Sequence, residues 1–182
     1  MDIGDNELLD HLVGLFHGNA AELGSFTPVP AAHVPQPYRQ LLDHHHHMTV
    51  TVEAFHDSPV NLRILQQRRQ GPLYCREILL TKQTDGLVVQ YGAMSINLRY
   101  LDEEVQQDIL SGQIPLGRTL IAHNVLREVQ LLQLWRVVYG PALALYFGQP
   151  TGTETFGRTA RIYCNGEPAV KLLEIVRACD AR

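Results

Sequence analysis

The sequence has few cysteines, and none of them stands in the CxxC spacing that is typical of metal and redox sites. Cys75, Cys164 and Cys179 also form no even disulfide framework, so we expect three reduced thiols. No apolar run approaches the roughly 20 residues of a bilayer-spanning helix, and the first residues carry acids where a secretory signal is basic. We therefore predict a cytoplasmic protein without membrane contact.

The sequence also lacks a cluster of lysines and arginines. Its 15 basic and 19 acidic residues give a net charge of -4, whereas a surface that follows nucleic-acid phosphates needs a basic patch. We therefore predict no nucleic-acid partner. The 182 residues are 45% hydrophobic without a break in composition, which favours a single domain, 1–182, with a sizeable core.

Local patterns predict an α+β domain, an antiparallel sheet with helices on one side. Helical periodicity follows residues 6–16 and 101–110, whereas the proline-rich residues 18–37 predict a connector or arm. The dipeptides Asp85-Gly86 and Asn165-Gly166 predict hairpin turns. The predicted strands are 48–55, 61–66, 73–81, 87–96, 159–163 and 169–176, and the pattern of 119–138 leaves helix and strand open.

Two charged residues stand inside apolar runs that read as strands. Arg76 belongs to CREILL and Glu174 to AVKLLEIV. Burying a charge costs free energy unless it has a partner or a ligand. The two residues therefore suggest a buried polar site.

The order of several motifs resembles the chorismate pyruvate-lyase family. CREILL is followed by an apolar strand with Tyr91-Gly92, then by IPLGRTL and GRTARIYCNGEPAVKLLEIV. An upstream element, which contains His44, His47, Met48 and Thr49, extends the resemblance beyond the last hundred residues. The resemblance implies a six-stranded antiparallel sheet flanked by helices, and we expect a helix plus a proline-rich arm over 1–40 and the catalytic sheet and flaps over 41–178.

The resemblance also implies an activity, the elimination of pyruvate from chorismate to give 4-hydroxybenzoate or a related hydroxybenzoate, with no cofactor and no metal. A planar guanidinium suits a ring carboxylate, so Arg76 takes that role by its motif position. Glu174 would face the C4 hydroxyl, to orient it or to accept a proton. The implied substrate-binding residues are His47, Met48, Thr49, Gly92 and Leu116, with Met48 against the ring and the Leu116 amide near the carboxylate.

Structural roles compete with these assignments. Arg76 can instead form an ion pair with Glu174, Glu77 or Glu53, and Glu174 can point outward from an edge strand. Met48 can be plain core. Two further arginines, Arg158 and Arg161, stand three apart on one strand and so face opposite sides, and we expect one to be exposed and Arg161 to support the site. Arg118 is expected to be a surface cation, with recognition of a second carboxylate as its alternative.

The run His44 to His47 invites a metal interpretation. Neighbours on an extended segment alternate faces, so at most two of the four side chains converge, and no third ligand completes a set. We therefore predict no metal site. His47, beside Met48-Thr49, is expected near the pocket as a hydrogen-bond donor to a carboxylate or as an acid.

Two other classes of function remain open. The same fold serves as the effector-binding domain of transcription regulators, which bind small molecules without turning them over, although the short acidic leading segment disfavours a DNA-binding module. A binding protein that kept the pocket and lost turnover is the other class. The predicted partners are chorismate and an aromatic product, and the arm allows a homodimer.

Overall fold

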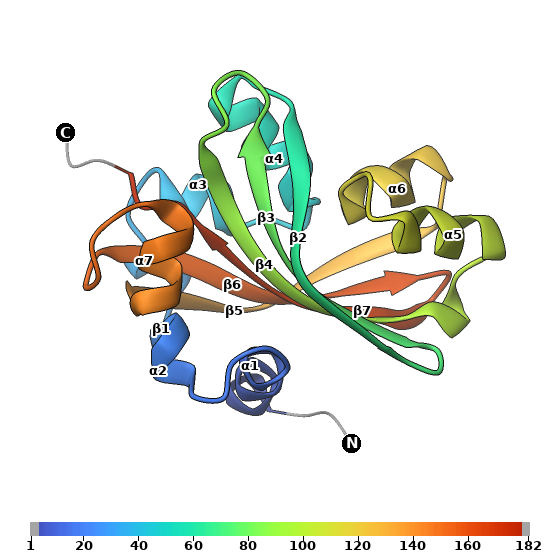
Figure 1. Ribbon diagram of the computed structural model, residues 1–182, viewed down its shortest axis with the longest axis horizontal. Coiled ribbons are helices and arrows are strands. Elements are labelled where there is room, and N and C mark those ends of the chain that lie inside the picture. The colour runs from blue at the N-terminus through green and yellow to red at the C-terminus, as the bar shows by residue number, and fades with distance from the viewer. Residues whose placement is uncertain (1–3, 180–182) are drawn as a thin grey trace.

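Seven strands form one antiparallel sheet in the computed structural model, which describes residues 4–179 (Figure 1). The order across the sheet is β1-β5-β6-β7-β4-β3-β2, so β7 is central and β1 and β2 are the edges. The strands are β1 Gly24–Val29, β2 Val60–Gln70, β3 Leu73–Lys82, β4 Val88–Asn97, β5 Arg127–Tyr139, β6 Glu154–Cys164 and β7 Glu167–Val176.

Helices cover both faces of the sheet, and each face has its own hydrophobic cluster. We call the face under α1, α2 and α7 the α1 face, and the face under α3, α4, α5 and α6 the α4 face. The helices are α1 Asp5–Gly14, α2 Ala20–Leu23, α3 Tyr38–Leu42, α4 Met48–His56, α5 Glu103–Ser111, α6 Leu116–Ala122 and α7 Pro141–Phe147, with 3₁₀ turns at Ala31–His33 and Leu98–Tyr100.

The α+β class is confirmed, but two details of the predicted sheet are wrong. The sheet has seven strands instead of six, and its helices lie on both sides instead of one. The central strands explain the second error. Consecutive residues of β7 from Leu172 to Val176 are all buried, which requires cover on both faces of the sheet.

Both predicted hairpins are confirmed. Asn165 and Gly166 connect β6 to β7 with φ angles of 54° and 83°, the left-handed pair that a type I′ turn requires. Gly86, with a φ of 74°, lies in the turn between β3 and β4. The predicted helices at 6–16 and 101–110 are α1 and α5, and Gly112 ends α5 with a φ of 66°.

The strand predicted at 48–55 is wrong, because this segment forms helix α4. The alternation in MTVTVEAF also places Met48, Thr49 and Val52 on one helical face, and these three residues are the buried ones. β-branched residues disfavour a helix only weakly, so packing on the α4 face decides the outcome.

The arm predicted over 18–37 is also wrong in part. It contains β1, which pairs along its length with β5, from Gly24 opposite Tyr139 to Val29 opposite Leu134. Pro28 is tolerated there because β1 is an edge strand. The undecided residues 119–138 divide between the end of α6 and most of β5.

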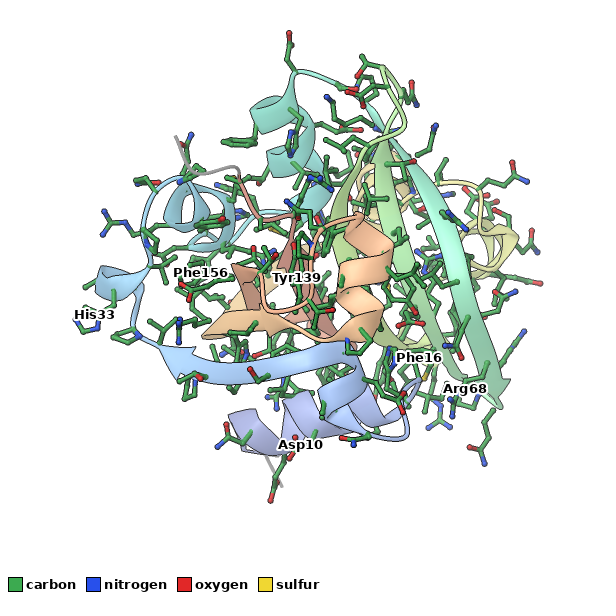
Figure 2. All side chains as sticks on the ribbon, turned by 60° about the vertical axis from the view of Figure 1, so that its left-hand side comes forward. Asp10, Phe16, His33, Arg68, Tyr139 and Phe156 are labelled. Carbon is green, nitrogen blue, oxygen red and sulfur yellow. The ribbon has the colours of Figure 1, made fainter. Side chains whose placement is uncertain are left out.

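A contact between Phe16 and Arg68 holds the segment after α1 against β2. Figure 2 shows the two side chains together, with the guanidinium carbon 5.3 Å from the ring centroid. None of the three cysteines forms a disulfide. Within residues 4–179, no helix is both long and apolar enough to cross a bilayer.

Candidate functional site

A small cavity lies on the α4 face, between the sheet and the starts of α4 and α6. Its volume of about 30 Å³ holds roughly one water molecule. Six of the seven predicted site residues line it, whereas Gly92 does not and instead lies opposite Glu174 on the neighbouring strand. The lining consists of His47, Met48, Thr49, Leu62, Arg76, Ile78, Leu80, Gln90, Met94, Pro115, Leu116, Gly117, Ile162, Leu172 and Glu174.

Arg76 is fully buried in this wall with most of its hydrogen-bonding capacity unused. Its Nη1 donates to the carbonyl oxygen of Ile109 at 3.3 Å, but Nε and Nη2 have no hydrogen-bond partner within residues 4–179. Burial lowers the pKa of Arg76, and the neighbouring Tyr74 opposes that effect. The two open donors form one edge of the guanidinium, and this edge matches the two oxygens of a carboxylate.

The three carboxylates that compete as partners of Arg76 all interact with other residues. Glu174 pairs with Arg158, Glu77 lies 2.6 Å from His17, and Glu53 pairs with Arg118. Arg76 therefore has no ion-pair partner among the described residues. The pairing with Glu53 also identifies Arg118 as a half-exposed structural cation.

Glu174 lies at the centre of the sheet, so an outward-facing edge position is ruled out. Its Oε2 accepts from the Nε of Arg158 at 2.7 Å, and the amide of Gln90 lies 3.5 Å from Oε1. Gln90 Oε1 is buried and has no partner in the described part of the chain. The site thus contains one ion-paired carboxylate beside an open amide oxygen.

Arg158 is the site residue that the sequence did not reveal. It is 1% exposed, where we expected one of Arg158 and Arg161 to be solvent-exposed, and Arg161 is half-buried on the opposite face. Besides Glu174, Arg158 donates to the carbonyl oxygens of His44 at 2.9 Å, His46 at 3.1 Å and Leu42 at 3.3 Å. It therefore attaches the segment before α4 to β6 and, through Glu174, to the central strand β7.

His47 is buried, and its Nε2 has no hydrogen-bond partner between residues 4 and 179. Burial lowers the pKa of His47 to about 4, and the charges of Arg127 and Arg158 add to the effect. The ring is therefore neutral at pH 7, which suits a hydrogen-bond donor better than a general acid. Gly117 lets the ring approach α6, since a Cβ there would lie 2.9 Å from the His47 Cβ.

The other three histidines contact backbone carbonyls or one another. His44 Nε2 lies 2.7 Å from the carbonyl oxygen of Leu41, and His45 Nδ1 lies 3.0 Å from that of Val129. His46 stacks on His44. Among residues 4–179, no group of three or more His, Cys, Asp or Glu side chains is placed to hold a metal ion.

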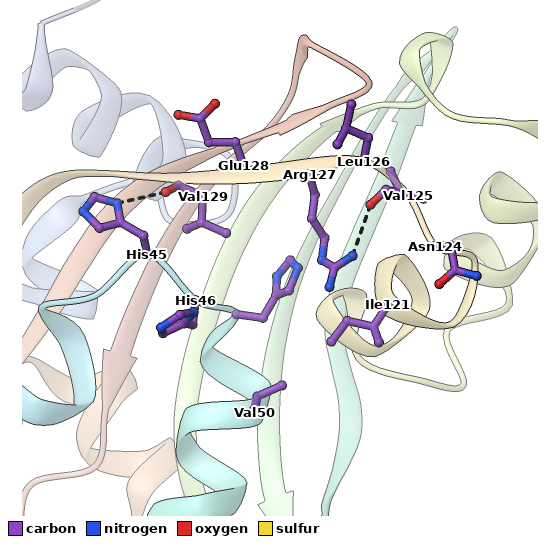
Figure 3. A pocket seen from close by; sticks show the side chains of 11 residues that line it. His45, His46, Val50, Ile121, Asn124, Val125, Leu126, Arg127, Glu128 and Val129 are labelled. Atoms are coloured by element: carbon purple, nitrogen blue, oxygen red, sulfur yellow. Dashed lines mark hydrogen bonds between the residues drawn. The ribbon is translucent and has the colours of Figure 1, made fainter.

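A much larger groove lies outside the cavity and is open to solvent (Figure 3). Its volume is about 740 Å³, and it lies between the histidine run, α6 and the start of β5. His47 is the one residue that lines both the cavity and the groove. Its side chain is therefore part of the wall between them.

Comparison with solved structures finds proteins of similar fold, although no protein-family model and no curated protein matches the sequence. The effector domain of PhnF from Mycobacterium smegmatis has a TM-score of 0.55 at 11% identity, covering 73% of this chain and 89% of that domain. The structure of PhnF from the same organism matches this chain with a TM-score of 0.54 at 11% identity, and the match covers 71% of this chain and 63% of PhnF.

A transcriptional regulator of the GntR family from Enterococcus faecalis V583 matches at 12% identity with a TM-score of 0.46, covering 63% of this chain and 91% of that one. The TM-scores above 0.5 are those to the two PhnF structures, and at such identities the likeness concerns the fold alone. This chain shares the fold of the PhnF effector domain.

Proposed function

We propose that this chain is a small-molecule-binding domain that holds an aromatic carboxylate in the cavity on the α4 face. The single observation that carries the proposal is the open edge of Arg76, a buried guanidinium whose Nε and Nη2 have no partner in residues 4–179. A buried charge without a partner is costly, and a bound carboxylate would supply two charge-assisted hydrogen bonds. The fold shared with an effector domain agrees with a binding role.

The remaining lining suits the body of such a ligand. Ile78, Met94 and Leu172 offer apolar surface for a ring, and Met48 lies in the opposite wall at the start of α4. Leu116 is the first residue of α6, so its N–H has no acceptor within the helix and is available to a carboxylate oxygen. Since the cavity holds only about one water molecule, binding requires its walls to move apart.

Turnover of chorismate is the second candidate. It is favoured by the convergence of Arg76, Glu174, Met48 and Leu116 on one cavity, the positions to which the family resemblance assigns roles. In that reaction the ether bond at C3 breaks, the C4 hydrogen is lost as a proton, pyruvate leaves and the ring becomes aromatic. The carboxylate of Glu174 is already paired with Arg158, and its role in that reaction would be to orient the C4 hydroxyl or to accept a proton.

The binding proposal is tested by calorimetry with 4-hydroxybenzoate and 4-hydroxybenzamide, two ligands of nearly equal shape. The acid should bind at least tenfold more tightly than the amide, because only the acid can pair with the Arg76 edge. Equal affinities would contradict the proposal.

The catalytic candidate is tested separately by incubation with chorismate and detection of pyruvate. Release that falls by roughly two to four orders of magnitude in Glu174→Gln, with a modest change in KM, would identify a lyase that uses this carboxylate in the reaction. Binding of 4-hydroxybenzoate without pyruvate release would leave the chain as a binding domain.

A further inference from the structure

The groove outside the cavity carries an unpaired positive charge. Arg127 points into it from the start of β5, and its Nη1 donates to the carbonyl oxygen of Val125 at 3.1 Å (Figure 3). No carboxylate of the described residues forms an ion pair with Arg127, and Figure 3 shows Glu128 turned away from it. The groove therefore offers a cation to an anionic ligand.

His47 supplies a second polar group to the same place. Its side chain is more than nine-tenths buried, its Nε2 has no partner within residues 4–179, and it lines the groove as well as the cavity. The charge of Arg127 contributes to the lowered pKa of His47, so the guanidinium acts electrostatically on the ring. A neutral imidazole N–H and a guanidinium together can hold an anionic group.

Three apolar side chains that line the groove face solvent. Leu126 is 74% exposed, Val50 49% and Ile121 37%. These side chains line the same groove as the polar groups and suit the carbon skeleton of a ligand that extends out of the cavity. An extended ligand would thus meet apolar surface next to Arg127.

We propose that Arg127 and His47 form an outer subsite that binds a second anionic group of the ligand whose first carboxylate is held by Arg76. The ligand is then an organic dianion that passes His47, with one end in the cavity and the other in the groove. The inner half of this arrangement rests on the proposed function, whereas the outer subsite stands on its own contacts.

The first experiment measures the advantage of a second carboxylate by calorimetry. The probes are benzoate, terephthalate and 4-carboxycinnamate, titrated into the wild type, Arg127→Gln and the control Arg63→Gln, which removes an exposed charge on the edge strand β2. At least one dicarboxylate should bind about tenfold more tightly than benzoate to the wild type and the control. The advantage should disappear in Arg127→Gln, while benzoate affinity stays unchanged.

The second experiment tests the outer subsite without the inner one. Inorganic phosphate is titrated into Arg76→Met while the imidazole of His47, assigned from the spectrum of His47→Gln, is followed by NMR. Phosphate should raise the pKa of His47 from its value of about 4. In the double variant that also carries Arg127→Gln, phosphate should no longer raise this pKa.

The outcomes separate the two proposals. A His47 signal that phosphate leaves unchanged, or changes equally without Arg127, overturns the outer subsite. If the dicarboxylates bind no more tightly than benzoate, the proposal that one ligand spans both sites is wrong. The proposed function is then tested by the binding of benzoate alone. If no carboxylate binds while phosphate still acts through Arg127, the proposed function is wrong and the outer subsite remains.

Discussion

Arg76 and Glu77 are neighbours on β3, both are fully buried, and they point to opposite faces of the sheet. On the α1 face, Glu77 lies 2.6 Å from His17 and accepts from the Tyr91 hydroxyl at 2.8 Å and the Gln66 amide at 3.0 Å. On the α4 face, Arg76 donates to the carbonyl oxygen of Ile109 at 3.3 Å and its guanidinium carbon lies 6.0 Å from the centroid of the Tyr74 ring, but Nε and Nη2 have no hydrogen-bond partner within residues 4–179. The protein thus provides hydrogen-bond partners for the Glu77 side chain, whereas it leaves two donors of Arg76 without partners among residues 4–179.

This difference distinguishes a structural charge from a candidate binding charge. Burial raises the pKa of Tyr91 well above its ordinary value and Glu77 adds to the rise, so this tyrosine remains a hydrogen-bond donor to the carboxylate. The protein itself therefore supplies the hydrogen-bond partners of the Glu77 carboxylate. The α4 face leaves open donors and acceptors on Arg76, His47 and Gln90 around a cavity, which is the arrangement that a ligand can complete.

The largest expected change in stability comes from removing the Glu77 carboxylate on the α1 face. Glu77→Ala leaves His17, Tyr91 and Gln66 without their shared acceptor and should lower the free energy of unfolding by about 3–5 kcal/mol. Urea denaturation measures the loss. The control Glu167→Ala removes an exposed carboxylate and should change stability by less than about 0.5 kcal/mol.

Removing the charge of Arg76 on the α4 face should not lower stability. Arg76→Met replaces a buried charge that lacks an ion pair with an apolar side chain of similar length, and this should leave stability unchanged or raise it by about 1–4 kcal/mol. The same urea experiment applies. A loss as large as that of Glu77→Ala would mean that Arg76 is a structural residue and that the contrast between the faces is false.

A smaller effect is expected where α6 approaches the histidine segment. A Cβ at Gly117 would lie 2.9 Å from the Cβ and 3.0 Å from the Cγ of His47, so Gly117→Ala should displace this ring and cost about 1–3 kcal/mol, partly offset by better helix propensity. The control Gly14→Ala, with nothing within 4 Å of its Cβ, should not destabilise. An unshifted His47 NMR signal in Gly117→Ala would contradict the close contact.

The pH dependence of stability tests the burial of His47. The pKa of His47 is about 4 in the folded protein against 6.5 in the unfolded chain, so the unfolded state binds more protons as the pH falls. The free energy of unfolding should therefore fall between about pH 6.5 and pH 4. Urea denaturation at pH 7 and pH 4.5 should show a smaller fall for His47→Gln than for the wild type, whereas identical falls would place His47 in solvent.

The sequence predicted the fold class and both hairpins, because turn dipeptides are local signals, and the charges in apolar strands pointed to Arg76 and Glu174. Four more of the fifteen residues that line the cavity, namely His47, Met48, Thr49 and Leu116, came from the family resemblance. It missed α4, since the alternation in MTVTVEAF satisfies a strand and a helical face equally well. It also missed β1, whose pairing with β5 joins residues more than a hundred positions apart. Such pairing leaves no trace in a short window of sequence.

Arg158 escaped prediction for a geometric reason. Counting back from the Asn165-Gly166 turn pairs Cys164 with Glu167 and would place Arg158 opposite Leu173. A register shift between Ile162 and Tyr163 moves the pairing by one residue, so Arg158 lies opposite Glu174. This irregularity brings Arg158 and Glu174 together as an ion pair, and no pattern of residues in the sequence predicts it.

The most direct test of the central claim is the affinity of 4-hydroxybenzoate for Arg76→Lys, measured by calorimetry beside the wild type. Lysine keeps the positive charge but loses the edge formed by Nε and Nη2, so the two parallel hydrogen bonds to a carboxylate cannot form. The account predicts that the variant folds and binds the acid at least tenfold more weakly, a loss of about 1.4 kcal/mol or more. An affinity equal to that of the wild type would contradict it, because the open edge of Arg76 would then not be where the carboxylate binds.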